Sequence, residues 1–347
     1  MKKIIALLLA LMMAVGMLAG CAKQNGDDTN ATTEKLSIVT TIFPEYDWVK
    51  EILGDKADHA DITMLLDNGV DLHSYQPTAD DIVKISDCDL FLYVGGESEG
   101  WVKDALKNSA NKDRKVINLL DVLGDSVKSE EVVEGMQEEE HEHEEGEAHE
   151  HEEEADEHVW LSLKNAEVLV GAISNALQEL DDDNKEIYAA NADAYMKKLA
   201  ALGAEYQTAV DNATCKTVLF GDRFPFRYLV DDYGLNYYAA FVGCSAETEA
   251  SFETISFLAK KADELKLPCV LTIEGKHHKI AETIVKNTAQ KGQKILTMDS
   301  MQSTTSKDVA SGTTYLSVME KNLAVLKEAM VKMQVTQLAE EKGDDLQ

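Results

Sequence analysis

Short apolar runs alternate along the first third of the chain with segments whose apolar residues recur at helical spacing. The apolar runs have the length of strands and occupy residues 36–43, 60–66, 90–94 and 116–119. The helical segments between them occupy residues 44–53, 77–86 and 101–108. Strands and helices that alternate in this way predict βαβ units and a mainly parallel sheet.

The same alternation returns in the last third of the chain. Strands are predicted at 217–220, 237–242, 270–273 and 295–298, and helices at 226–233, 252–265, 280–290 and 314–333. Between the two regions lie helical patterns at 163–180 and 185–212, and the second would reach roughly 40 Å at 1.5 Å per residue. We therefore predict an α/β fold of two lobes joined by a long helix. Ligands of open α/β sheets bind beyond the carboxyl ends of the strands, which here means the cleft between the lobes.

The N-terminus carries a targeting pattern. Lys2 and Lys3 precede an apolar run at 4–18, which is too short and wrongly flanked for a spanning helix and predicts a cleaved export signal. The small residues before Cys21 resemble a bacterial lipoprotein signal, which implies a lipid on Cys21. A plain secretory signal is the alternative. Residues 22–34 are polar and predict a flexible tether.

Acidic residues dominate the chain, which has a net charge of −31. This charge argues against a nucleic-acid partner. Residues 130–157 lack Lys, Arg and apolar periodicity, which predicts a loop that is disordered until something binds it. Four histidines lie within this tract: His141, His143, His149 and His151. Neutral imidazole binds zinc well, so we expect weak secondary metal capture there, against the alternative of a merely solubilising loop.

Candidate metal ligands follow the predicted strands. His73 lies in a polar loop after the strand at 60–66, and His158 follows the acidic tract two residues before Trp160. Further candidates after later strands are Asp222, Glu274, His278 and Asp299. Imidazole and carboxylate are the ligand types that hold zinc or manganese.

The remaining cysteines form no C-x-x-C pair, which argues against a cysteine-rich zinc motif. They are Cys88, Cys215, Cys244 and Cys269. We interpret Cys244, in a Val-Gly-Cys-Ser segment, as a packing residue rather than a metal ligand.

Two motifs carry a resemblance to a known family. The segment 68–77 resembles the histidine loop of the zinc and manganese ABC-transporter solute-binding proteins, and 157–161 resembles their His-x-Trp-Leu motif. The acidic, His-rich insertion is similar to the loop of the zinc-importing members. The resemblance implies a rigid linker helix and a metal in the interlobe cleft, with His73, His158 and Asp299 as ligands.

The chain departs from that family at the third ligand. Where the family has histidine, or glutamate in manganese members, this sequence has Gly221, which offers no side-chain donor. Asp222 is the nearest substitute, and Glu274 and His278 are rivals from a neighbouring strand end. The sequence leaves these three alternatives open.

The resemblance implies a monomeric, lipid-anchored extracytoplasmic receptor that captures Zn²⁺ and delivers it to the permease of an ABC importer. A manganese receptor of the same family is the first alternative. A surface adhesin and a zinc hydrolase are further ones, although no His-Glu-x-x-His motif is present for a hydrolase. The expected organisation is a signal peptide (1–20), a tether (21–35), a first lobe (36–183), a linker helix (184–213) and a second lobe (214–347).

Overall fold

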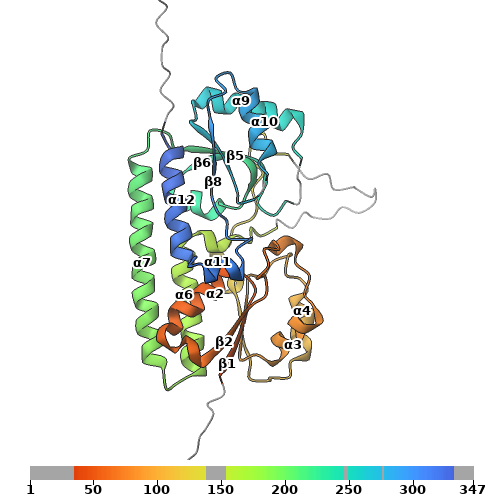
Figure 1. Ribbon diagram of the computed structural model, residues 1–347, viewed down its shortest axis with the longest axis vertical. Helices are drawn as coiled ribbons and strands as arrows, with labels where there is room; N and C mark the ends of the chain where they lie inside the picture. The colour runs from red at the N-terminus through yellow and green to blue at the C-terminus, as the bar shows by residue number, and fades with distance from the viewer. Residues whose placement is uncertain (1–34, 138–153, 246–248, 276, 332–347) are drawn as a thin grey trace, which may run out of the picture. The chain divides into compact units, whose positions relative to one another are not determined.

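The computed structural model describes residues 35–137, 154–245, 249–275 and 277–331 (Figure 1). Two four-stranded sheets form its framework, in the orders β2-β1-β3-β4 and β6-β5-β7-β8. The first contains β1 (Leu36–Thr40), β2 (Ala60–Met64), β3 (Leu90–Tyr93) and β4 (Lys115–Asn118). The second contains β5 (Thr217–Phe224), β6 (Asn236–Val242), β7 (Cys269–Thr272) and β8 (Lys294–Thr297). All strand pairs are parallel, which confirms the predicted pair of α/β lobes.

Helices connect the strands within each lobe. In the first half of the chain they are α2 (Phe43–Leu53), α3 (Ala79–Asp87), α4 (Val102–Ala105), α5 (Leu119–Leu123), α6 (Leu163–Leu180) and α7 (Lys185–Asp211). In the second half they are α8 (Arg227–Tyr233), α9 (Phe252–Leu265), α10 (Lys279–Asn287), α11 (Ser306–Ala310) and α12 (Tyr315–Ala329). The helices α5 and α11 were not predicted. Each has only five residues, too few to show a helical period, and each begins at a side-chain cap.

The 27-residue helix α7 packs on α6, α2 and α12, and Figure 1 shows it beside α12. One hydrophobic core contains residues of both sheets and of these helices, from Ile38 through Tyr195 to Tyr315. A second cluster fills the space between the second sheet and the helices α9 and α10. Because close-packed interiors resist deformation, the shared core holds the two lobes in a defined relation.

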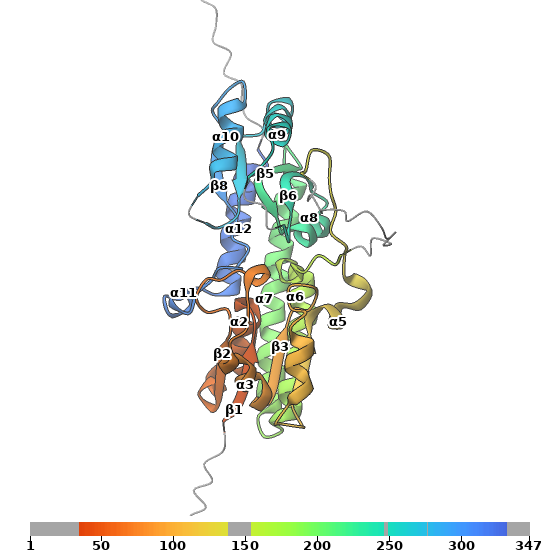
Figure 2. The same ribbon diagram turned by 90° about the vertical axis from the view of Figure 1, so that its right-hand side faces the viewer.

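Loops at the carboxyl ends of the strands meet between the lobes (Figure 2). The Arg223 guanidinium forms an ion pair with Asp71. The Trp160 indole nitrogen donates a hydrogen bond to the carbonyl oxygen of Ser300 at 2.9 Å. The loops that carry the candidate ligands therefore meet at the predicted edge of the sheets.

The acidic tract differs from the sequence-based expectation at both ends. Ser129 and Ala155 form an antiparallel bridge, and the Gln137 backbone N–H donates to the carbonyl oxygen of Ala240 at 3.0 Å. The predicted disorder of 130–157 is therefore wrong for the residues that flank the tract's centre. The four tract histidines lie outside the described residues, as do Cys21, the predicted signal and the tether. Among the helices of the described part, none combines the length and the apolar character needed to cross a membrane.

Candidate metal site

His73 and His158 meet in the structure. His73 lies on a single 3₁₀ turn, Leu72–Ser74, in the loop between β2 and α3, and His158 directly precedes another, Val159–Leu161. Their Nε2 atoms are 3.2 Å apart. Two nitrogens that share a tetrahedral zinc with Zn–N bonds of about 2.0–2.1 Å would be separated by about 3.3 Å. The two imidazoles are therefore placed to bind one cation.

The outer nitrogen of each ring is held by a polar group. The Nδ1 atom of His158 lies 2.9 Å from Asp156 Oδ1, so Nδ1 carries the proton and the lone pair of Nε2 faces His73. The Nδ1 atom of His73 lies 2.7 Å from the Ser98 hydroxyl, and its backbone N–H donates to Asp71 Oδ1 at 3.0 Å. Such outer contacts orient the rings and make them better ligands.

The two rings differ in their affinity for a proton. Burial, and then the neighbouring His158, lowers the pKa of His73 to about 3, so this ring is neutral. Burial also opposes a charge on His158, but the Asp156 carboxylate outweighs it and raises the pKa of His158. A metal ion at this pair therefore competes with a proton mainly at His158.

Buried carboxyl groups lie behind His73. Glu157 Oε2 is 3.5 Å from His73 Nδ1, while its Oε1 accepts a hydrogen bond from the Ser98 backbone N–H at 2.9 Å. Burial raises the pKa of Glu157, and burial raises the pKa of the next carboxyl, Glu99, to about 7. Burial, and then the neighbouring Glu99, raises the pKa of Glu45. A cation at the histidine pair would be favoured by negative charge on these groups, because opposite charges attract more strongly away from water.

Cys244, in the loop after β6, joins the pair from the second lobe. One potential ligand atom of each of His73, His158 and Cys244 lies within 4.8 Å of the others, and the described residues contain no other such group of His, Cys, Asp or Glu. The Cys244 backbone N–H donates to Glu130 Oε1 at 2.9 Å. Burial, and then Glu130, raises the pKa of the thiol, so the sulfur is protonated in the metal-free site. The Cys244 sulfur thus lies beside two potential metal ligands, whereas the sequence favoured a packing role for this residue.

Gly221 offers no ligand, and the structure gives a reason for glycine at this position. A Cβ atom there would lie 2.6 Å from Ala281 Cα in α10. The neighbouring Asp222 is outside the three-residue group. Its carboxylate accepts hydrogen bonds from the backbone N–H groups of Arg223 at 3.0 Å and Ile273 at 3.3 Å.

The other predicted acids are also outside the group. The Glu274 carboxylate accepts hydrogen bonds from the Ser300 backbone N–H at 2.7 Å and from its hydroxyl at 2.8 Å. Asp299 Oδ1 accepts a hydrogen bond from the Met301 backbone N–H at 2.8 Å. His278 is the residue preceding α10 and lies outside the group as well. Both carboxylates thus hold the backbone of the loop after β8.

That loop brings Gln302 to the site. Nothing in the sequence indicated this residue, because a side-chain amide is not a typical zinc ligand. Gln302 is 4% exposed, and its side chain lies near enough to His73 to offset a small part of the lowering of that ring's pKa, which is due mainly to burial. Its Nε2 atom donates to the Ser300 hydroxyl at 3.1 Å. Its Oε1 atom is buried without a complete hydrogen bond to any described residue. An amide oxygen in this position can accept a hydrogen bond or bind a cation.

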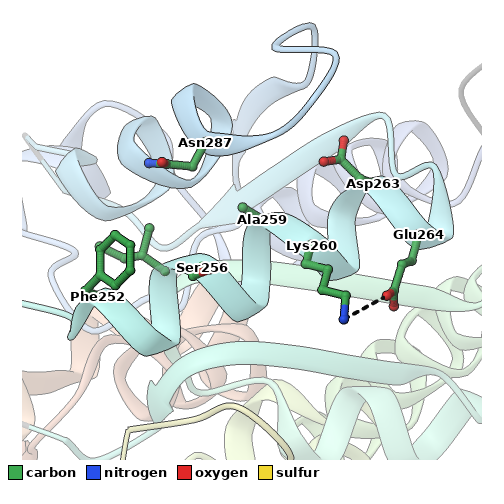
Figure 3. A pocket seen from close by; sticks show the side chains of 8 residues that line it. Phe252, Ser256, Ala259, Lys260, Asp263, Glu264 and Asn287 are labelled. Atoms are coloured by element: carbon green, nitrogen blue, oxygen red, sulfur yellow. Dashed lines mark ion pairs between the residues drawn. The ribbon is translucent and has the colours of Figure 1, made fainter.

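Cavities border the second lobe. A cavity of about 750 Å³ is lined by Asp71 of the first lobe and by Arg223, Glu274 and His277 of the second, so it reaches the loop that carries His73. A separate hollow of about 330 Å³ lies between α9 and α10 (Figure 3). Its lining includes an ion pair between Lys260 and Glu264 but neither histidine nor cysteine, so it lacks a ligand set for zinc.

Gly243 leaves room for the His158 ring. A Cβ atom at this position would lie 2.9 Å from both Cε1 and Nδ1 of that ring. We expect Gly243→Ala to displace His158 and weaken zinc binding by about 10- to 100-fold, the range typical for changes just outside the ligands. Zinc titration against a competing chelator measures this. Gly275→Ala is the matched control, since a Cβ atom there meets nothing within 4 Å. Equal affinity of the Gly243 variant and wild type would mean that the ring is not confined by this contact.

Comparisons with known proteins identify a family that matches most of the chain. A family model described as the zinc-uptake complex component A, periplasmic, matches residues 38–329. The zinc-binding lipoprotein AdcA of Streptococcus pneumoniae serotype 4 is 34% identical over 328 residues, which cover 94% of this chain and 61% of AdcA. The chain thus spans about three fifths of that relative's length. The high-affinity zinc uptake system protein ZnuA of Bacillus subtilis is 32% identical over 312 residues, covering 90% of this chain and 91% of ZnuA.

A solved structure shares the fold. The crystal structure of the Zn(II)-bound ZnuA-like domain of Streptococcus pneumoniae AdcA superimposes with a TM-score of 0.66 at 31% identity. The match covers 85% of this chain and 99% of that domain.

Proposed function

Because the chain belongs to the ZnuA family of periplasmic zinc-uptake components, we propose that it captures zinc outside the cytoplasm and delivers it to an ABC importer. The observation that carries the proposal is the 3.2 Å separation of the Nε2 atoms of His73 and His158. In this proposal His73 and His158 bind the cargo, and Cys21 carries a lipid that keeps the receptor at the membrane. The receptor acts as a monomer, with lobes at 36–183 and 214–347.

Zinc is the proposed cargo because two imidazoles favour it over manganese, which prefers oxygen ligands and binds more weakly in general. A manganese receptor of the same family is the alternative. The metal content of purified protein, followed by competition between the two ions, tests the choice. We expect one zinc per chain and no displacement of zinc by equimolar manganese. Absence of bound metal, or preferential retention of manganese, would overturn the proposal.

A hydrolytic role is less well supported by the site. A zinc hydrolase needs a general base within hydrogen-bonding distance of a metal-bound water. The nearest glutamate, Glu157, instead faces the outer nitrogen of His73 and accepts a hydrogen bond from Ser98. An adhesin would bind host material whether or not a permease is present, so zinc uptake that is lost without the permease separates it from a transport receptor.

We propose that the histidines of the acidic tract collect zinc weakly and rapidly near the cleft. Deletion of residues 138–153 tests this and retains Gln137, whose amide oxygen accepts a hydrogen bond from the Ser251 backbone N–H at 2.7 Å. We expect the variant to keep the tight site and to lose only weaker additional zinc ions in calorimetric titration. Loss of all binding would show that the tract itself is the receptor. A variant with only its four histidines changed to asparagine controls for the loss of chain length.

A further inference from the structure

We infer that Cys244 and Gln302 of the second lobe complete the cargo site, so that zinc is held by two imidazoles, one thiolate and one amide oxygen. The inference rests on the proposed function and specifies its ligand set. None of the acids that the sequence suggested as the third ligand takes this place. The site would thus join two ligands of the first lobe to two of the second.

The position of the Cys244 sulfur supports the first part. It belongs to the only group of potential metal ligands among the described residues, and both of its partners there are the cargo-binding histidines. The loop is held in place by the hydrogen bond from the Cys244 backbone N–H to Glu130. Gly243 lets this loop approach the His158 ring closely, since any side chain there would meet it. Glu130 therefore holds the loop through the Cys244 backbone N–H and also contacts the thiol, so a bound cation would take the place of the thiol proton.

The second part is supported by the orientation of Gln302. A chain of hydrogen bonds runs from Glu274 through the Ser300 hydroxyl to Gln302 Nε2. Because this chain holds the amide nitrogen, the opposite atom, Oε1, is left buried without a hydrogen-bond partner among the described residues. A buried polar atom without a partner is costly, and a bound cation would satisfy it. Glu274 then acts as a positioning residue for a ligand.

A thiolate in the site has a consequence for selectivity. Soft sulfur ligands favour zinc and other thiophilic ions, whereas manganese prefers carboxylate and water oxygens. Four ligands in tetrahedral arrangement are also the usual shell of zinc. The receptor would therefore reject manganese through Cys244, even though carboxylate groups, which manganese prefers as ligands, lie nearby.

Cobalt substitution of the full chain tests the thiolate directly. We expect the wild-type cobalt complex to show a sulfur-to-cobalt charge-transfer band and strong tetrahedral d–d bands. The variant Cys244→Ser should lose the charge-transfer band and bind zinc on the order of 10²-fold more weakly. Cys88→Ser is the matched control, because the Cys88 thiol donates to the Ile85 carbonyl oxygen and is absent from the ligand group. Thermal unfolding of each metal-free variant establishes that it is folded.

Separate variants test the preference for zinc over manganese and the identity of the fourth ligand. Cys244→Asp exchanges the soft donor for a hard one and should narrow the ratio of zinc to manganese affinity at least tenfold. Gln302→Leu should weaken zinc binding at least tenfold and retain the charge-transfer band, whereas Gln302→Glu keeps an oxygen donor and should not weaken it. Equal zinc affinity of Gln302→Leu and wild type would remove Gln302 from the ligand set.

The outcomes distinguish the inference from the function on which it rests. If wild type binds one zinc tightly, but its cobalt complex lacks the charge-transfer band and Cys244→Ser binds zinc normally, the thiolate ligand is refuted and the receptor function stands. If wild type binds no zinc at all, the proposed function itself fails.

Discussion

Replacing His73 by alanine should weaken one-to-one zinc binding by on the order of 10²- to 10³-fold. Structural zinc sites contribute an apparent free energy of about 10–16 kcal/mol, or roughly 2.5–4 kcal/mol for each of four ligands. Each 1.4 kcal/mol corresponds to about a tenfold change in affinity. The loss is not offset by a neighbouring donor, because Asp71 near the ring is already paired with Arg223. Competition with a chromophoric chelator measures the affinity.

The control for this prediction is His59→Ala, which removes an exposed histidine of the same lobe. It should leave the affinity unchanged. His158→Ala should reproduce the effect of His73→Ala, since the Nε2 atoms of both rings are placed to bind one ion. A near-normal titration of either site variant would rule out a cation shared by the two rings.

Placing a histidine at position 221, as the related family has, should destabilise the protein and bring no gain in zinc affinity. A Cβ atom at this position would lie 2.6 Å from the Cα atom and 2.9 Å from the backbone nitrogen of Ala281. Relief of this overlap requires a shift of α10, and overpacking of this kind typically costs about 1–3 kcal/mol. Urea unfolding of the metal-free Gly221→His and Gly221→Ala variants measures the free energy of unfolding.

Gly171→Ala provides the matched control, because a Cβ atom at Gly171 in the middle of α6 meets nothing within 4 Å. There alanine should stabilise the protein by roughly 0.5–1 kcal/mol, since glycine loses more conformational freedom in a helix. An unfolding free energy for Gly221→Ala equal to wild type would show that α10 adapts easily. A tighter zinc complex in Gly221→His would show that the second lobe still accommodates a histidine ligand at this strand.

Local patterns identified the fold class and the first pair of candidate ligands. Strand-length apolar runs and helical periods depend on residues a few positions apart, and this is why the segments 163–180 and 252–265 are helices with the predicted bounds. His73 and His158 could also be recognised, because each lies within a distinctive short motif. Their meeting, across 85 positions of sequence, followed from the two-lobe topology and the family resemblance rather than from either motif alone.

The rest of the site depended on tertiary contacts. Cys244 and Gln302 carry no local signal, and both reach the histidines only because loops from different strands of the second sheet end at the same edge. Asp222 and Glu274 looked like ligands in the sequence, yet their carboxylates bind backbone N–H groups that only the folded chain brings near them. Residue type and local pattern therefore determined which helices and strands form and which two imidazoles could serve as metal ligands. The packing of one lobe against the other decided which further side chains lie beside these imidazoles, because those contacts join residues far apart along the chain.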